Sequence, residues 1–185
     1  MAYEVEKRSK LTRAQYARLQ SHLDTHATFL GEKRLDSFLF RKPSYLRIRL
    51  SSDDPNVYIT EKTGTYADAA RFEKDTKIKR AALPGFVDKL QKRGFQECVP
   101  VITYRRTYIL DGLKMELNRI NYLGLILEVE VVTNKKSAVL QLEQKVSLML
   151  TRLRVKELPA NIYQGMLDRN YRDHLVDIRK ISFAP

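Results

Sequence analysis

The sequence predicts an α+β protein built on an antiparallel sheet or barrel. Eight segments alternate apolar and polar residues with the period of two that strands impose. They follow one another mostly in hairpin order, which indicates antiparallel pairing. Other segments space their apolar residues like helices, and such helices need an apolar sheet surface to cover.

The first half of the chain predicts one helix among five strands. Residues 2–10 alternate as a strand, and Thr12 is a suitable N-cap for a helix over 13–26. Further strands are predicted at 34–40, 45–51, 56–62 and 71–79, separated by turn-forming stretches.

The second half predicts three strands and three helices. A helix over 84–93 ends at Gly94, the residue type favoured just after a helix C-terminus. Strands follow at 99–110, 113–120 and 125–133, and helices at 136–156 and 160–169. The pattern predicts no element after Tyr171.

Length and composition limit the class of protein. The 185 residues fit a single domain over 1–170 with a C-terminal tail over 171–185. The formal net charge of +12 indicates anionic partners. We expect a cytoplasmic protein, because no apolar run is long enough for a membrane span and the N-terminus has no hydrophobic signal region. The single cysteine excludes a cysteine-rich zinc site, so any metal should be held by carboxylates.

Nearly every predicted strand has one charged face. Two arrangements satisfy this pattern: the charged faces are solvated outer surfaces, or they line an interior channel while the apolar faces pack outward on the helices. Glu4 and Glu6, like Glu128 and Glu130, set two carboxylates about 7 Å apart on one strand face. Such neighbours are unfavourable unless cations lie between them, which favours the channel.

The residue types of such a channel indicate its ligand. Carboxylates without histidine or cysteine select hard divalent ions such as Mg²⁺ or Mn²⁺. Arginine side chains match phosphate oxygens bidentately. We therefore expect a metal-bound polyphosphate.

The ordered set of motifs resembles the CYTH domain, or triphosphate tunnel metalloenzyme, superfamily. The family's N-terminal ExExK is similar to Glu4-Val5-Glu6-Lys7-Arg8, and its RxR to Arg47-Ile48-Arg49. Further matches are Thr60 to Lys62 for TxK, Arg71 to Asp75 for RxExE, Arg105 in the Lys-x-Arg block, and Leu123-Gly124 followed by Glu128 and Glu130 for the last acidic block. Two positions depart from the pattern, because Thr103 stands where a lysine is usual and Asn118 where many members carry aspartate.

The resemblance implies an eight-stranded antiparallel β-barrel, or tunnel, with helices packed on the outside. It implies triphosphate binding by Arg8, Lys10, Arg47, Arg49, Lys62, Arg71 and Arg105. It implies Mg²⁺ or Mn²⁺ binding by Glu4, Glu6, Glu73, Asp75, Glu116, Glu128 and Glu130. The catalytic candidates are Glu4, Glu6, Lys62 and Glu116.

Three functions stay open at this point. The first is an enzyme acting on tripolyphosphate, thiamine triphosphate or ATP, either as a triphosphatase or as a class IV adenylyl cyclase that makes cyclic AMP. The second is a non-catalytic module that binds polyphosphate, nucleotide or an RNA 5′ end, which Thr103 and Asn118 motivate. The third is a plain nucleic-acid binder, which is disfavoured because the tyrosines form no recognisable stacking motif. A membrane partner is not expected, and a homodimer is an alternative because members of the family often dimerise.

Overall fold

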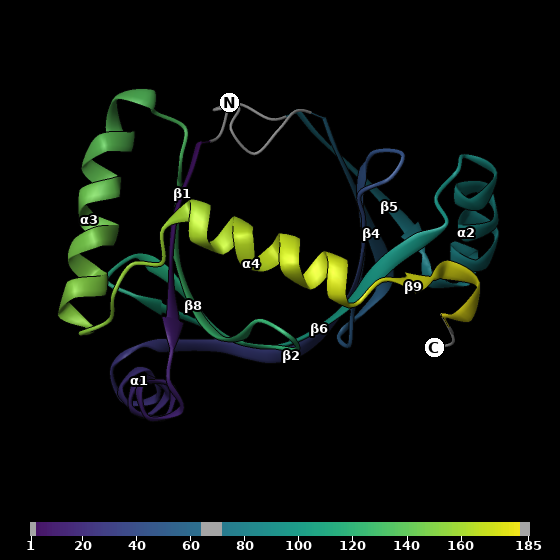
Figure 1. The fold of residues 1–185 in the computed structure, drawn as a ribbon. Coiled ribbons are helices and arrows are strands. Elements are labelled where there is room, and N and C mark those ends of the chain that lie inside the picture. Colours follow the sequence, from purple (N-terminus) through teal and green to yellow (C-terminus); the bar gives the residue numbers. More distant parts are fainter. Residues whose placement is uncertain (1–2, 64–71, 182–185) are drawn as a thin grey trace. The chain divides into compact units, whose positions relative to one another are not determined.

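The computed structural model describes residues 3–63 and 72–181. The strands are β1 (Tyr3–Leu11), β2 (Thr28–Phe40), β3 (Tyr45–Ser51), β4 (Asp54–Thr63), β5 (Phe72–Lys79), β6 (Glu97–Leu110), β7 (Leu113–Ile120), β8 (Gly124–Thr133) and β9 (Val176–Asp177). The helices are α1 (Arg13–His26), α2 (Leu83–Lys92), α3 (Val139–Arg152) and α4 (Ala160–Asp173), and short 3-10 turns cover Arg80–Ala82, Lys136–Ala138 and Ile178–Lys180. Figure 1 shows the ribbon coloured along the sequence, with most of these elements labelled.

The predicted α+β class and its eight-stranded antiparallel sheet are confirmed. The strand order is β1-β8-β7-β6-β2-β3-β4-β5, and β9 pairs with β6. Among the described residues hydrogen bonds do not join β1 to β5, the two ends of this order. The chain divides into two compact units, one of Met1–Lys33 with Tyr104–Leu167 and one of Arg34–Thr103 with Asp168–Pro185. The predicted boundary between a domain over 1–170 and a tail stays a prediction.

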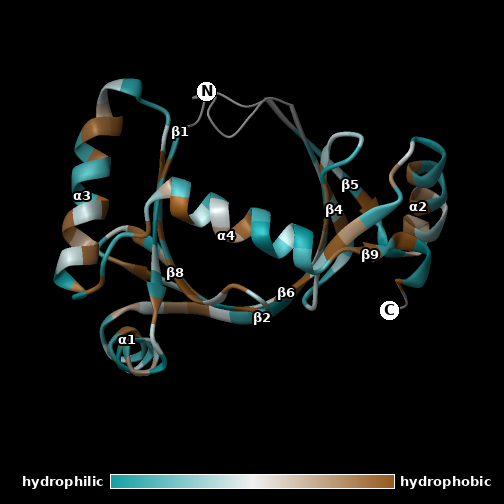
Figure 2. Ribbon diagram, viewed as in Figure 1, coloured by the Kyte–Doolittle hydropathy of each residue, from teal (hydrophilic) through white to brown (hydrophobic). Residues whose placement is uncertain are grey.

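The core of the first unit lies between its strands and the helices α1 and α3. Leu19 and Leu23 of α1 and Val146 of α3 are fully buried against apolar side chains of β1, β7 and β8, such as Leu127 and Val129. Figure 1 shows both helices beside these strands, and Figure 2 shows hydrophobic residues on α3 and on the strands. Thr12 caps α1 as predicted, since its hydroxyl accepts from the N–H of Gln15.

The core of the second unit lies between β2 to β4 and α2. Leu83 and Leu90 of α2 are fully buried with Phe40, Leu46 and Ile48 of the sheet. The helix ends where Gly94 takes a left-handed backbone with φ of 91°, as the sequence predicts. The helices α1 and α3 of the first unit and α2 of the second therefore cover the apolar faces of the strands.

Several element ends differ from the prediction. β2 begins at Thr28, because the extended strand continues through Gly31, which reads as a turn residue in the sequence. α3 ends at Arg152, since Arg154 takes a left-handed backbone with φ of 55°. α4 continues to Asp173, and β9 lies within the predicted tail. No helix in the described part of the chain is long and apolar enough to cross a membrane.

Candidate active site

The predicted site residues of the first unit lie on the strand faces that point away from α1 and α3. Because successive side chains of a strand alternate, burial of Val5, Met115 and Val129 under the helices turns their neighbours to the other face. The predicted site residues on this face are Glu4, Glu6, Arg8, Lys10, Arg105, Glu116, Glu128 and Glu130. The sheet thus places on one surface residues that are far apart in the sequence.

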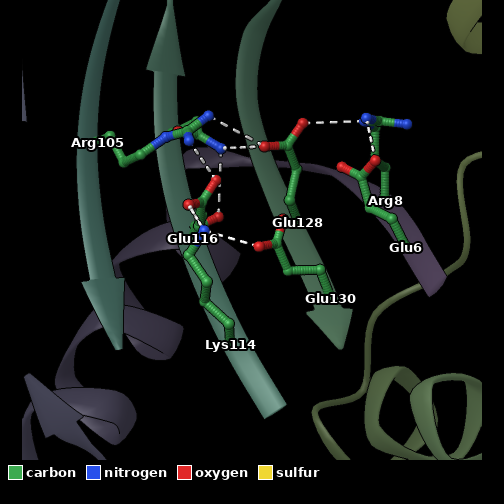
Figure 3. A network of polar contacts seen from close by, with 8 residues as sticks. Glu6, Arg8, Arg105, Lys114, Glu116, Glu128 and Glu130 are labelled. Atoms are coloured by element: carbon green, nitrogen blue, oxygen red, sulfur yellow. Dashed lines mark hydrogen bonds and ion pairs between the residues drawn. The ribbon is translucent and has the colours of Figure 1, made fainter. Parts of the chain in front are cut away.

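Seven of the charged side chains on this face form one ion-pair network in which acids and bases alternate (Figure 3). Its order is Glu6, Arg8, Glu128, Arg105, Glu116, Lys114 and Glu130, and successive members lie 2.5 to 3.2 Å apart between nitrogen and oxygen. Four carboxylates and three basic groups give the network a formal charge of −1 when all are ionised. The alternation compensates each buried acid with a base on at least one side.

The centre of the network is buried. Only 2% of Glu116 and 8% of Glu128 is exposed, and Asn118 is fully buried. Burial alone would raise the pKa of Glu128, but the guanidinium groups of Arg8 and Arg105 outweigh it and lower this pKa. For Glu116 burial dominates, and its pKa is raised. Buried carboxylates of this kind are stable only while their cations stay in place.

Asn118 ties Arg105 into the network. The Nε of Arg105 donates to the Oδ1 of Asn118 at 2.8 Å, and the Nδ2 of Asn118 donates to Glu128 at 3.1 Å. Asn118 therefore acts as a hydrogen-bonding link between a base and an acid. The sequence marks Asn118 only as a departure from the family pattern, because its partners come from β6 and β8.

The two ends of the network, Glu6 and Glu130, are register partners on β1 and β8. Side chains at such positions have Cβ atoms about 5 Å apart, where like charges oppose each other. Within residues 3–63 and 72–181 no basic side chain bridges these two carboxylates. Burial, followed by the charge of Glu128, raises the pKa of Glu6 to about 7. At this point of the network two carboxylates oppose each other, and no base among the described residues lies between them.

The donor set at this point suits a hard divalent ion. Glu6 and Glu130, with Glu4 two residues along the same strand face, offer only carboxylate oxygens, which are typical of Mg²⁺ and Mn²⁺ sites. In the described part of the chain no three acidic, histidine or cysteine side chains already converge as a metal centre. Arg8 and Lys114 hold Glu6 and Glu130 instead, so metal binding would compete with these two ion pairs.

The second unit has its own charged face. Arg47 and Arg49 of β3 stand in register with Thr60 and Tyr58 of β4, and Thr60 with Asp75 of β5. The Nη2 of Arg47 donates to the Oγ1 of Thr60 at 3.3 Å, while its buried Nε has no hydrogen-bond partner among the described atoms. A buried guanidinium N–H that lacks a hydrogen-bond partner is suited to donate a hydrogen bond to an anionic oxygen.

Three other predicted residues belong to this part of the sequence. Lys62 and Glu73 are register partners in β4 and β5. Arg71 lies outside the described residues.

A contact from α4 completes the surroundings of Arg8. The ring of Tyr163 lies over its guanidinium, 4.6 Å from Cζ to the ring centroid, and the N–H of Leu158 donates to its carbonyl at 2.7 Å. The sequence gives no sign of this stacking, since Tyr163 reads as one residue of an amphipathic helix. Together these contacts fix the position of a base that holds Glu6 and Glu128.

Comparisons with known proteins show the family and the fold of the chain. Residues 2–159 match the family model of the CYTH domain. No curated protein matches the chain. Similar solved structures include PH1819 from Pyrococcus horikoshii OT3, with 20% identity, a TM-score of 0.72 and coverage of 90% of this chain and 99% of that one. Another is PH1012 from the same organism, with 24% identity, a TM-score of 0.63 and coverage of 83% and 92%.

A third similar structure is the Hippeastrum protein HpAC1, which is described as having a dominant triphosphatase activity. It has 16% identity, a TM-score of 0.59 and coverage of 89% of this chain and 96% of that one. At these identities the structures show a common fold.

Proposed function

The chain belongs to the CYTH domain family, and from this premise we propose that it is a metal-dependent triphosphatase acting on a linear triphosphate. The ion-pair network of the first unit carries the proposal. Its four carboxylates and three bases on one strand face combine the ligands of a hard metal ion with the ligands of phosphate oxygens. The proposed metal position lies beside the register partners Glu6 and Glu130.

Glu4, Glu6 and Glu130 would hold the ion, which when bound neutralises phosphate charge and lowers the pKa of a bound water. The further predicted ligands Glu73 and Asp75 belong to the second unit, so the proposal for this metal position does not use them. Competition for Glu6 and Glu130 would free Arg8 from Glu6 and Lys114 from Glu130, while Arg8 keeps Glu128 and Lys114 keeps Glu116 as partners. Both bases could then bind phosphate oxygens with Lys10, which lies on the same face.

Phosphoryl transfer depends mainly on positioning the phosphate and on neutralising its charge. The bound ion and the bases that turn to the phosphate would do both. Burial raises the pKa of Glu116, which suits this carboxylate to accept a proton. The buried, hydrogen-bond-free Nε of Arg47 supports further phosphate binding in the second unit. There the proposal also includes Arg49, Lys62 and Arg71 as phosphate ligands.

The test is the identity of the products. Tripolyphosphate, thiamine triphosphate and ATP are each incubated with the purified chain and Mg²⁺ or Mn²⁺, and the products are separated by chromatography. We expect orthophosphate, with tripolyphosphate or thiamine triphosphate turned over. Cyclic AMP with pyrophosphate from ATP would replace the triphosphatase by an adenylyl cyclase. Tight binding without turnover of any of the three would replace the enzyme by a binding module.

A further inference from the structure

The charged face of the first unit contains two opposed pairs of carboxylates. Glu6 faces Glu130 across β1 and β8, and Glu116 faces Glu128 across β7 and β8. The first pair has no base between its members among the described residues, whereas Arg105 binds both members of the second. The second pair therefore already has a cation bound to both acids, and the first pair has none among the described residues.

Arg105 is held on all sides of its guanidinium. Nη1 contacts Glu116 at 2.6 Å, Nη2 contacts Glu128 at 3.2 Å, and Nε donates to Asn118 at 2.8 Å. The planar fork of an arginine matches acceptors in such a fixed arrangement, and removing it would leave two buried acids without this partner. Arg105 is thus bound by three groups that belong to two different strands.

The other two bases of the network lie nearer to solvent. The side chains of Arg8 and Lys114 are 29% and 37% exposed, compared with 17% for Arg105. Lys114 can turn toward a ligand in solvent most readily, because long basic side chains keep their charged ends mobile at a surface, whereas Tyr163 also contacts Arg8. Arg105 lacks this freedom while Asn118 and Glu128 stay in place.

Resting on the proposed function, we propose that Arg105 is a resident cation that replaces a second metal ion between Glu116 and Glu128. The face then binds one divalent ion, at Glu6 and Glu130. Asn118 is a positioning residue in this arrangement, because it fixes the guanidinium between the two acids. An aspartate at position 118 would add a third acid beside this pair, whereas the asparagine adds no charge.

The number of bound ions tests this inference. Mn²⁺ is titrated into the full chain, and the free ion is followed by its electron paramagnetic resonance signal. We expect one bound Mn²⁺ per unaltered chain and two in Arg105→Met. Arg106→Met is the matched control, because Arg106 is the next residue of β6 but pairs with Asp24 and Glu32 on the other face. This control should bind one ion.

The outcomes separate the inference from the function on which it rests. Two bound ions in the unaltered chain, or one in a folded Arg105→Met variant, would overturn the resident cation and leave a metal-dependent triphosphatase standing. No bound ion and no turnover in the unaltered chain would remove the proposed function itself.

A second measurement needs no variant. Anomalous scattering from Mn²⁺ in crystals with tripolyphosphate should give a peak beside Glu6 and Glu130. A peak between Glu116 and Glu128 contradicts the inference.

Discussion

Glu6 of β1 is the register partner of Glu130 of β8, and no basic side chain of the described residues bridges the two carboxylates. Each pairs with a different base, Glu6 with Arg8 and Glu130 with Lys114. Like charges opposed across two strands destabilise a sheet unless a proton or a cation lies between them. The folded protein should therefore respond both to pH and to divalent ions at this position.

The stability of the metal-free chain should fall as the pH rises from 5 to 8. The pKa of Glu6 is about 7 in the folded protein, compared with 4.5 for an unperturbed glutamate. Between these two values the folded state holds a proton that the unfolded state has released, so raising the pH favours unfolding, by up to about 3 kcal/mol. Urea unfolding of the unaltered chain and of Glu6→Gln, in chelator at both pH values, measures this loss.

The Glu6→Gln variant should show a clearly smaller decrease of the unfolding free energy over this pH range. Glu157→Gln is the control, because Glu157 is a half-exposed surface carboxylate paired with Lys7. An unchanged pH dependence in Glu6→Gln would show that Glu6 does not carry the shifted titration.

Loss of the Arg47 guanidinium should weaken tripolyphosphate binding. Its buried Nε has no hydrogen-bond partner among the described atoms, so a phosphate oxygen would gain a charge-assisted hydrogen bond there. Such a bond contributes about 1.5 to 3 kcal/mol, so Arg47→Met should raise the Kd roughly tenfold or more. Calorimetric titration measures the Kd, and Lys74→Met, at an exposed position on the other face of β5, should leave it unchanged. Equal affinities in both variants would exclude Arg47 as a phosphate ligand.

Removing the ring of Tyr163 should destabilise the position of Arg8. The ring lies 4.6 Å from the Cζ of Arg8, a geometry in which cation–π attraction contributes about 1 kcal/mol. A double-mutant cycle with Tyr163→Ala and Arg8→Met, followed by urea unfolding, should give a coupling free energy of about this size. Tyr163→Phe keeps the ring and should keep the coupling. No coupling between the two positions would mean that the stacking adds nothing to stability.

The sequence allows some of these features to be predicted and hides others. Alternation along each strand identifies which side chains share a face, because the period of two is a local property. It does not show that Glu6 stands opposite Glu130, since the register of β1 and β8 depends on pairing across most of the chain. The three partners of Arg105 lie 11, 13 and 23 residues further along, and no local pattern selects them from the other polar residues.

The stacking of Tyr163 is hidden for a similar reason. An amphipathic helix predicts which of its residues are covered, but not which basic side chain covers one of them. The predicted start of β2 and the predicted end of α3 are also wrong for local reasons. The strand continues through Gly31, and the helix stops before Arg154, which takes a left-handed backbone.

The metal dependence of tripolyphosphate hydrolysis is the most direct test of the proposed metal site at Glu6 and Glu130. Orthophosphate release is measured for the unaltered chain, for Glu130→Gln and for the surface control Glu157→Gln, each with Mg²⁺ or Mn²⁺ and with chelator. We predict release that requires the metal, that falls roughly a hundredfold or more in Glu130→Gln, and that stays unchanged in Glu157→Gln. Equal release in chelator, or an undiminished rate in Glu130→Gln, would contradict the assignment of the Glu6 and Glu130 face as a metal-dependent triphosphate site.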